Sequence, residues 1–240
     1  MATSTSRIRG VLLDKDGTIL DYARTWIPIN REIALAAADG DRALADALLR
    51  AGGQDPVTDL VTPGAPLAAA GADGIADCFA AVLGPRTPHR LLDTVKRLFA
   101  EGGGKHAVLL EGAREAIAAL KGMGLAVGLA TNDSDGGMRA SLARVGLMEA
   151  FDYVIAADGG HGAKPGPGMA LAFAEAVALE PQLLAAVGDA RHDLEMAHGA
   201  GYGLRVAVLS GTGTRVDLTP TADVVINSVR ELPGLLKRDP

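Results

Sequence analysis

Four short clusters of polar side chains stand out in the sequence because their residue types bind cations and oxyanions. The first is Asp14-Lys15-Asp16-Gly17-Thr18, in which two carboxylates lie two residues apart and leave an extended strand on the same side. Like charges this close repel one another unless a cation or a proton lies between them. Gly17 allows the backbone to turn away directly after the second carboxylate. The cluster therefore indicates a cation site or a proton-transfer site.

The other three clusters supply complementary groups. Thr131-Asn132 offers a hydroxyl and an amide, Lys164 lies before two prolines, and Asp189 and Asp193 form a second acidic pair. Taken singly, each is typical of ordinary structure: a helix N-cap, a surface lysine and an acidic helix start. Together they provide a nucleophile, an acid, a phosphate-binding lysine and hard oxygen ligands for Mg²⁺. This set favours phosphoryl transfer through an aspartyl phosphate.

The elements that would position these clusters alternate along the chain. Short apolar runs predict six buried strands, at residues 11–13, 125–130, 153–157, 184–187, 204–209 and 224–226. Helical patterns follow at residues 112–123, 134–146, 167–178, 191–200 and 229–237. This alternation predicts an α/β fold with a doubly wound parallel sheet, which binds ligands at the carboxyl ends of its strands. Each cluster lies at such an end.

One stretch lacks a buried strand. Residues 21–106 contain helical patterns near 29–38, 40–51, 73–83 and 88–101, separated by proline and glycine. We expect a helical cap at 21–106, inserted into a core made of residues 1–20 and 107–240. The run Gly102-Gly103-Gly104 is expected to be the hinge that closes the cap.

Composition excludes several classes of protein. The chain has 240 residues, a net charge of −6, 48% hydrophobic residues and a single cysteine, Cys78. These values exclude a disulfide scaffold and argue against disorder and nucleic-acid binding. No apolar run approaches the roughly 18–20 residues that a membrane helix needs, and no secretory signal is recognisable. A cytoplasmic protein without membrane or nucleic-acid partners is therefore expected, either as a monomer or as a homodimer.

The order and spacing of DKDGT, TN, KPGP and GDARHD resemble the haloacid dehalogenase-like hydrolase superfamily, over about residues 10–228. The helical insert looks like the C1 cap of subfamily I on a Rossmann-like core. The DKDGT form and the late VLSGTGTRVDL stretch are similar to the phosphoglycolate phosphatase-like members. The resemblance implies a phosphatase that acts on a small phosphorylated metabolite, with 2-phosphoglycolate as the leading candidate.

The resemblance also implies residue roles. Asp14 would be the nucleophile, Asp16 the acid and base, and Lys164 a bridge between the phosphate and the nucleophile. Thr131 and Asn132 would bind phosphate oxygens. Mg²⁺ would be held by Asp14, Asp189, the backbone carbonyl of Asp16 and water molecules, with Asp193 either as a further ligand or directly behind the ligands. His192, between two acids, is expected to be an exposed helix-start residue.

Related chemistries remain open. A sugar-phosphate mutase of the β-phosphoglucomutase type uses the same core, and a non-catalytic phospho-ligand binding protein could share the fold. A dehalogenase has no need for an acid at position 16, and a phosphonatase needs a cap lysine, for which Lys96 and Lys105 are the candidates. A receiver domain carries its acceptor aspartate after the third strand rather than the first.

Substrate choice is expected to reside in the cap. The candidates for specificity are Arg24, Trp26 and Arg31. The two arginines could bind a small anionic substrate, and Trp26 could either contact the substrate or pack between the cap and the core.

Overall fold

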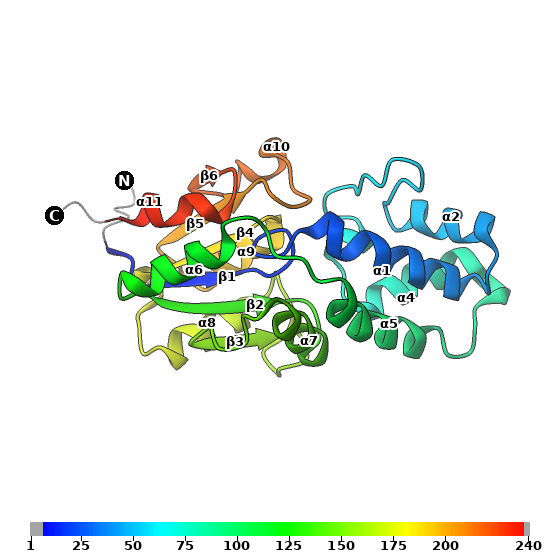
Figure 1. Ribbon diagram of the computed structural model, residues 1–240, viewed down its shortest axis with the longest axis horizontal. Coiled ribbons are helices and arrows are strands. Elements are labelled where there is room, and N and C mark those ends of the chain that lie inside the picture. Colours follow the sequence, from blue (N-terminus) through cyan, green and yellow to red (C-terminus); the bar gives the residue numbers. More distant parts are fainter. Residues whose placement is uncertain (1–6, 238–240) are drawn as a thin grey trace.

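A six-stranded parallel sheet forms the centre of the molecule (Figure 1), seen in a computed structural model that describes residues 7–237. The strand order is β3-β2-β1-β4-β5-β6, and every neighbouring pair is parallel. The strands are β1 (Gly10–Leu13), β2 (Ala126–Thr131), β3 (Tyr153–Ala156), β4 (Leu184–Gly188), β5 (Leu204–Val208) and β6 (Val224–Ile226). The predicted fold class is confirmed.

The register of the sheet brings the predicted clusters to one edge. Leu13, the last residue of β1, lies opposite Leu129 of β2 and Val187 of β4. Since the three strands run in the same direction, the residues that follow them leave the sheet on the same side. Residues 14–18, 131–132 and 189 therefore meet although they are far apart in the sequence.

Helices cover both faces of the sheet, which is what makes it doubly wound. Val11 and Leu13 pack with helices α6, α7 and α11 on one face, and Leu12 packs with α8 and α9 on the other. In β2, a Cβ at Gly128 would lie only 2.5 Å from the Phe173 ring, so glycine is what lets α8 pack closely here. The core helices are α6 (Ala113–Gly122), α7 (Asp135–Val145), α8 (Gly168–Ala176), α9 (Arg191–Gly199), α10 (Arg215–Leu218) and α11 (Leu232–Leu236), with short 3-10 turns η3 (Pro181–Leu183) and η4 (Val229–Glu231).

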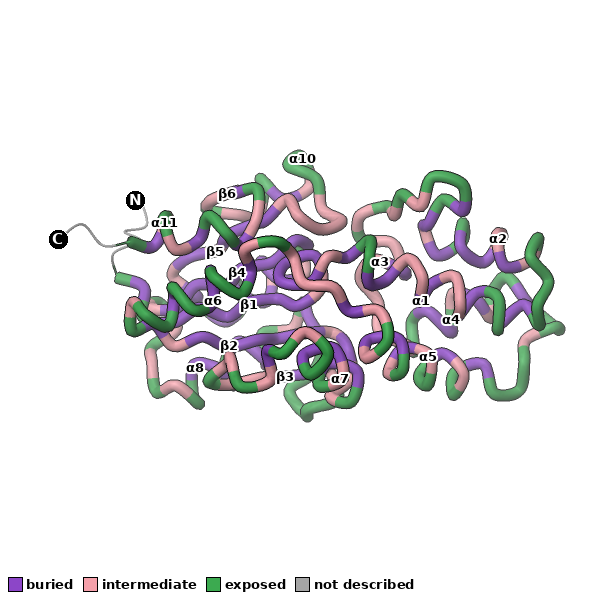
Figure 2. Tube along the Cα trace, in the orientation of Figure 1, coloured by how far each residue is buried: buried purple, intermediate pink, exposed green. Residues whose placement is uncertain are grey.

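Residues 22–106 form a helical cap beyond the carboxyl ends of the strands (Figure 1). It comprises α1 (Tyr22–Ala37), α2 (Arg42–Ala51), α3 (Pro66–Ala69), α4 (Ala72–Leu83), η2 (Gly84–Arg86) and α5 (Leu91–His106). These helices bury their own apolar cluster around Ile29, Leu48 and Phe79. Figure 2 shows buried stretches running through the sheet, whereas the cap helices alternate between buried and exposed residues.

Two chain segments join the cap to the core, and they lie side by side. The Asp21 amide donates to the Val108 carbonyl at 2.8 Å, and the Leu110 amide donates to the Ile19 carbonyl at 2.9 Å. Paired segments of this kind hold the cap close to the carboxyl edge of the sheet.

The predicted glycine hinge is wrong. Gly102, Gly103 and Gly104 lie inside α5. A Cβ at Gly102 would be 2.6 Å from Ile29 Cγ1, and one at Gly103 would be 2.3 Å from Ser141 Oγ. The missing side chains allow α5 to pack closely on α1 and α7.

Helix α1 begins earlier than predicted, at Tyr22 instead of residue 29. The Asp21 side chain caps it by accepting a hydrogen bond from the Arg24 amide at 3.0 Å. Pro28 lies inside the helix, where burial of Tyr22, Trp26 and Ile29 on one face outweighs the loss of one backbone donor.

Within residues 7–237, no helix combines the length and the apolar character that a bilayer span requires.

Candidate active site

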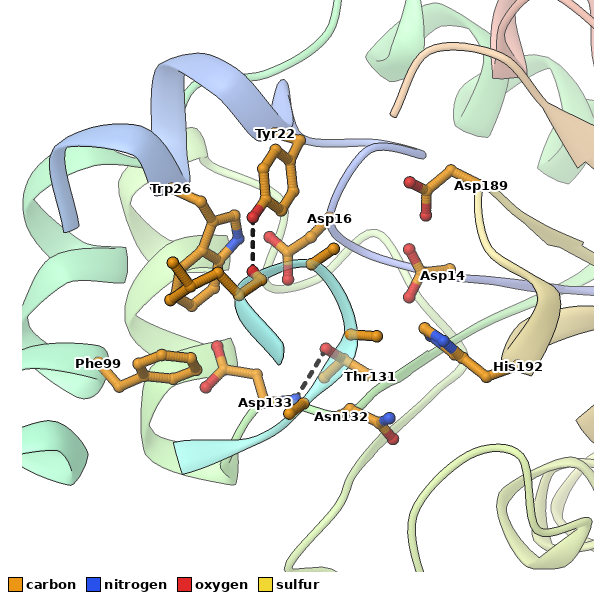
Figure 3. A pocket seen from close by; sticks show the side chains of 14 residues that line it. Asp14, Asp16, Tyr22, Trp26, Phe99, Thr131, Asn132, Asp133, Asp189 and His192 are labelled. Atoms are coloured by element: carbon orange, nitrogen blue, oxygen red, sulfur yellow. Dashed lines mark hydrogen bonds between the residues drawn. The ribbon is translucent and has the colours of Figure 1, made fainter. Parts of the chain in front are cut away.

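A small cavity of about 50 Å³ lies between the carboxyl edge of the sheet and the cap (Figure 3). From the core it is lined by Asp14, Asp16, Thr131, Asn132, Asp133, Asp189 and His192. From the cap it is lined by Tyr22, Trp26, Leu67, Ala68, Ala69, Ala70 and Phe99. Members of three of the four predicted clusters thus form one wall of a single site.

Lys164 lies behind this wall and pairs with its acids. Its Nζ lies 2.6 Å from Asp14 Oδ1 and 2.7 Å from Asp193 Oδ1, and its side chain is fully buried. The two carboxylates outweigh the effect of burial and hold the pKa of Lys164 above its usual value. Lys164 therefore stays charged beside the predicted nucleophile.

Three buried carboxylates form a group suited to a metal ion. Asp14, Asp189 and Asp193 each offer an oxygen, and these oxygens lie within 4.8 Å of one another. Burial raises the pKa of Asp14 to about 7, with Asp193 and Asp16 adding to the shift against the opposing effect of Lys164. Burial, Asp14 and Asp193 raise the pKa of Asp189 well above its usual value.

The pKa of Asp193 shifts in the opposite direction from the pKa values of Asp14 and Asp189. Burial alone would raise its pKa, but Lys164 and His192 outweigh that effect and hold the pKa below its usual value. The raised pKa values of Asp14 and Asp189 mean that this group takes up positive charge readily. A hard divalent cation such as Mg²⁺ fits such a set of carboxylate oxygens.

The loop after β5 fixes the side chain of Asp189. The sequence analysis predicted Asp189 but not this contact with the loop. The Thr212 amide donates to Asp189 Oδ2 at 2.7 Å, and the Ser210 hydroxyl donates to the Gly17 carbonyl at 2.7 Å. Gly17 has φ +80°, and a Cβ there would lie 2.6 Å from Asp189 Oδ2. Glycine is therefore required at position 17 both for the turn and for the approach of Asp189.

Asp16 lies apart from the metal group. Its Oδ2 is 2.8 Å from Lys15 Nζ, and its side chain keeps 20% exposure toward the cavity. A second carboxylate, Asp133, lies 3.1 Å from the same nitrogen. The Asp16 side chain is thus held by Lys15, away from the group of Asp14, Asp189 and Asp193.

Lys15 and Asp133 are the main residues that sequence reasoning missed. Lys15 is fully buried, and its ammonium also lies 5.3 Å from the centroid of the Trp26 ring. The one available signal was the pattern of a lysine between two aspartates, with a further acid next to Asn132. A lysine rarely enters a core unless it is paired, so such a lysine needs nearby acids.

Thr131 and Asn132 occupy the end of β2. Thr131 is buried and its hydroxyl accepts a hydrogen bond from the Asp133 amide at 3.1 Å. Asn132 Oδ1 accepts from the Lys164 amide at 2.9 Å, and Nδ2 donates to the Lys164 carbonyl at 3.3 Å. Asn132 thereby ties the lysine loop to the sheet, and its second amide hydrogen remains for another acceptor.

The cap residues proposed from the sequence fall in different places. Trp26 lines the cavity and is buried, whereas Arg24 is exposed and does not line it. Arg31 Nη2 pairs with Asp59 at 2.6 Å and also donates to the Pro56 carbonyl, away from the cavity. The α1 helix turns both arginines away from the side that faces the core.

Two further predictions concern His192 and the lysines of the cap. His192 is half-buried and lines the cavity, with Nε2 3.5 Å from Asp193 Oδ1, so its predicted exposure is wrong. The start of α9 directs it inward beside the carboxylates. Lys96 and Lys105, the phosphonatase candidates, pair with Asp73 and Glu32 on the surface and do not line this cavity. Cys78 is partly buried against the cap cluster.

Comparison with known proteins agrees with this fold. Residues 8–201 match the family model of haloacid dehalogenase-like hydrolases, so the chain belongs to this family of hydrolases. It is similar to the phosphoglycolate phosphatase of Escherichia coli strain K12, with 28% identity over 242 residues that cover 94% of this chain and 91% of the relative. The phosphoglycolate phosphatase of Nitrosococcus oceani is 30% identical over 142 residues, covering 59% of this chain and 63% of that protein.

Solved structures share the fold. A predicted phosphoglycolate phosphatase from Haemophilus somnus superposes with a TM-score of 0.71 at 17% identity, covering 96% of this chain and 99% of that chain. CbbY from Rhodobacter sphaeroides in complex with phosphate gives a TM-score of 0.64 at 24% identity, covering 94% and 96% of the two chains. At these identities the likeness establishes the fold only.

Proposed function

We propose that the protein is a Mg²⁺-dependent phosphomonoester hydrolase that works through an aspartyl phosphate on Asp14. The observation that carries this proposal is the contact of Asp14 with the buried ammonium of Lys164 at 2.6 Å, at the edge of a cavity. A carboxylate held in this way is an oxygen nucleophile aimed into a confined space. Membership of the hydrolase family and the named phosphatases among the relatives support the same reaction class.

The chemistry divides between two carboxylates. Asp14 attacks phosphorus and forms a P–O bond, while the bond from phosphorus to the leaving oxygen breaks and Asp16 gives that oxygen a proton. Asp16 then takes a proton from a water molecule that attacks the aspartyl phosphate, which releases inorganic phosphate and restores Asp14. Lys164, Thr131 and Asn132 would bind phosphate oxygens during both steps.

The metal site follows from the carboxylate group. Asp14, Asp189 and Asp193 would hold Mg²⁺ together with the backbone carbonyl of Asp16. When bound, the ion would supply positive charge that offsets repulsion between the phosphate and the clustered acids.

The substrate is proposed to be a small phosphorylated metabolite, since the cavity is small and lies between the core and the cap. The names of the relatives make 2-phosphoglycolate the first compound to test. We propose a cytoplasmic enzyme that acts on free metabolites and not on nucleic acid or membranes, as a monomer or a homodimer.

Phosphate release from a panel of compounds tests this function. The panel contains 2-phosphoglycolate, hexose phosphates, nucleotides, p-nitrophenyl phosphate and a phosphonate, each with Mg²⁺ and with EDTA. We expect release that requires Mg²⁺, and labelled phospho-enzyme that accumulates in Asp16→Asn but never in Asp14→Asn. Release that EDTA leaves unchanged would overturn the metal role. Isomerisation of a sugar phosphate without release would identify a mutase instead.

A further inference from the structure

The cap wall of the cavity has a composition that constrains the leaving group. Its residues are aromatic or aliphatic: Tyr22, Trp26, Phe99, Leu67 and the alanines that follow Leu67. Within residues 7–237, no lysine or arginine lines the cavity. Lys15 and Lys164, which lie behind the core wall, are each already bound by two carboxylates.

The charge of the core wall points in the same direction. Asp14, Asp16, Asp133 and Asp189 all line the cavity. Lys15 offsets the charge of Asp16 and Asp133, and Lys164 with Mg²⁺ would offset that of Asp14 and Asp189, so these pairs leave no cation for a second anionic group. A carboxylate on the leaving group would face the cap wall, where no lining side chain is positively charged. The cavity therefore favours an uncharged leaving group.

One hydrogen-bond donor on the cap wall could recognise such a leaving group. Trp26 is 5% exposed, and its Nε1 is a buried donor with no hydrogen-bond partner among the described residues. In Figure 3 the indole nitrogen lies on the ring edge turned toward Asp16, on the cavity side. A buried donor without a partner costs free energy, and an indole N–H can only donate. Its natural partner is an oxygen of a molecule that enters the cavity.

The neighbours of Trp26 fix its position. The Phe99 ring centroid lies 4.5 Å from that of Trp26, and the Lys15 ammonium lies 5.3 Å from the indole centroid. The Tyr22 hydroxyl is already used, because it donates to the Leu67 carbonyl at 2.6 Å. The indole N–H is thus a fixed donor on an otherwise apolar wall.

We propose that the substrate is a short phosphomonoester whose leaving alcohol is uncharged and carries an oxygen that accepts a hydrogen bond from Trp26 Nε1. This proposal rests on the proposed phosphatase function and narrows it. It disfavours 2-phosphoglycolate, whose carboxylate would lack a cation.

A matched series of substrates tests the proposal on the unmodified protein. Ethyl phosphate has no acceptor, 2-hydroxyethyl phosphate adds a neutral acceptor, and 2-phosphoglycolate adds an anionic one on the same two-carbon frame. We expect kcat/KM for 2-hydroxyethyl phosphate to exceed that for each of the others by about tenfold, because a site built to bind a hydroxyl rejects analogues that lack it. A preference for 2-phosphoglycolate over 2-hydroxyethyl phosphate would overturn the proposal.

A variant separates the role of the N–H from that of the ring. Trp26→Phe keeps an aromatic ring and removes the donor, so the ratio of kcat/KM between 2-hydroxyethyl and ethyl phosphate should fall about tenfold, to near one. Leu67→Met is the matched control, since it alters the same wall while keeping the indole N–H and its neighbours Phe99 and Lys15, and it should preserve that ratio. An unchanged ratio in Trp26→Phe would contradict the proposal. If p-nitrophenyl phosphate and every other phosphate ester are inert with Mg²⁺, the proposed function itself fails.

Discussion

The two walls of the cavity differ in chemistry and in how their side chains are held. On the core wall, Lys164 binds Asp14 and Asp193, and Lys15 binds Asp16 and Asp133. The cap wall carries rings and methyl groups, with one unsatisfied donor at Trp26. Under the proposed function, the core wall would carry out the phosphoryl chemistry, whereas the cap wall would shape the site and recognise the leaving group. Variants on the two walls should therefore fail in different ways.

The largest effect is expected at the nucleophile. Asp14→Asn preserves the size of the side chain but removes the nucleophilic oxygen, so activity should fall by about a thousandfold or more. Phosphate release by the purified variant measures this, and thermal unfolding controls for the fold. Turnover within tenfold of the parent enzyme would sink the assignment of Asp14.

Next in size is the loss of the buried lysine beneath Asp16. Lys15→Met should lower the free energy of unfolding by about 3 kcal/mol, because it leaves the buried Asp133 without its cation. Urea unfolding measures the change. Lys105→Met is the matched control: it breaks an exposed pair with Glu32 and should cost about 1 kcal/mol or less. Equal losses in the two variants would show that burial of the Lys15 pair has no special weight.

A smaller effect is expected from pH and metal together. Because the pKa of Asp14 is raised to about 7, the metal-free folded protein binds more protons than the unfolded chain between about pH 4 and pH 7. The stability linked to this group is therefore complete below about pH 4 and is lost as the pH rises through 7.

Mg²⁺ binds the ionised carboxylates, so the stabilisation that it gives to the folded protein should grow as the pH rises from about 4 to 7. We expect the rise in Tm from EDTA to Mg²⁺ to be at least about 3 °C larger at pH 7.5 than at pH 5.5. Melting curves under the four conditions check this. A metal effect that is equal at both pH values, or larger at pH 5.5, would argue against these carboxylates as the ligands.

The smallest effect is expected on the outer side of the cap. Arg24→Ala and Arg31→Ala should each change kcat/KM by less than about twofold, since neither side chain lines the cavity and surface substitutions are usually mild. The same steady-state assay that is used for Trp26→Phe measures both. A large rise in KM for either variant would mean that the cap brings the arginine to the substrate.

Much of the core could be predicted from the sequence. Short apolar runs followed by Asp14, Thr131 and Asp189 predicted buried parallel strands with polar groups at their carboxyl ends, and the sheet has that arrangement. The prediction works because a short apolar run and the polar residue that ends it are local features, and parallel strands joined by helices place their carboxyl ends on one edge of the sheet. Nothing comparable constrains the cap, where packing between helices decides what each side chain contacts.

The errors have the same origin. The glycine run at 102–104 reads equally well as a hinge or as a close-packing surface, and only the positions of Ile29 and Ser141 decide between them. From the sequence, Arg31 was a candidate for substrate binding. In the folded cap its side chain instead pairs with Asp59 at 2.6 Å. Contacts between residues distant in the chain leave no periodic trace in a single sequence.

The sequence by itself determined the parallel sheet, the polar residues that follow its strands and the set of chemical groups at the site. These features depend on residue type and on short spacings along the chain. Only the tertiary structure decided that Lys15 is buried between Asp16 and Asp133, that Trp26 faces the cavity and that both cap arginines face away from it. Burial and ion pairing depend on which surfaces of the cap and the core lie against each other. These contacts join residues far apart in the chain, so they are set by the fold of the whole molecule.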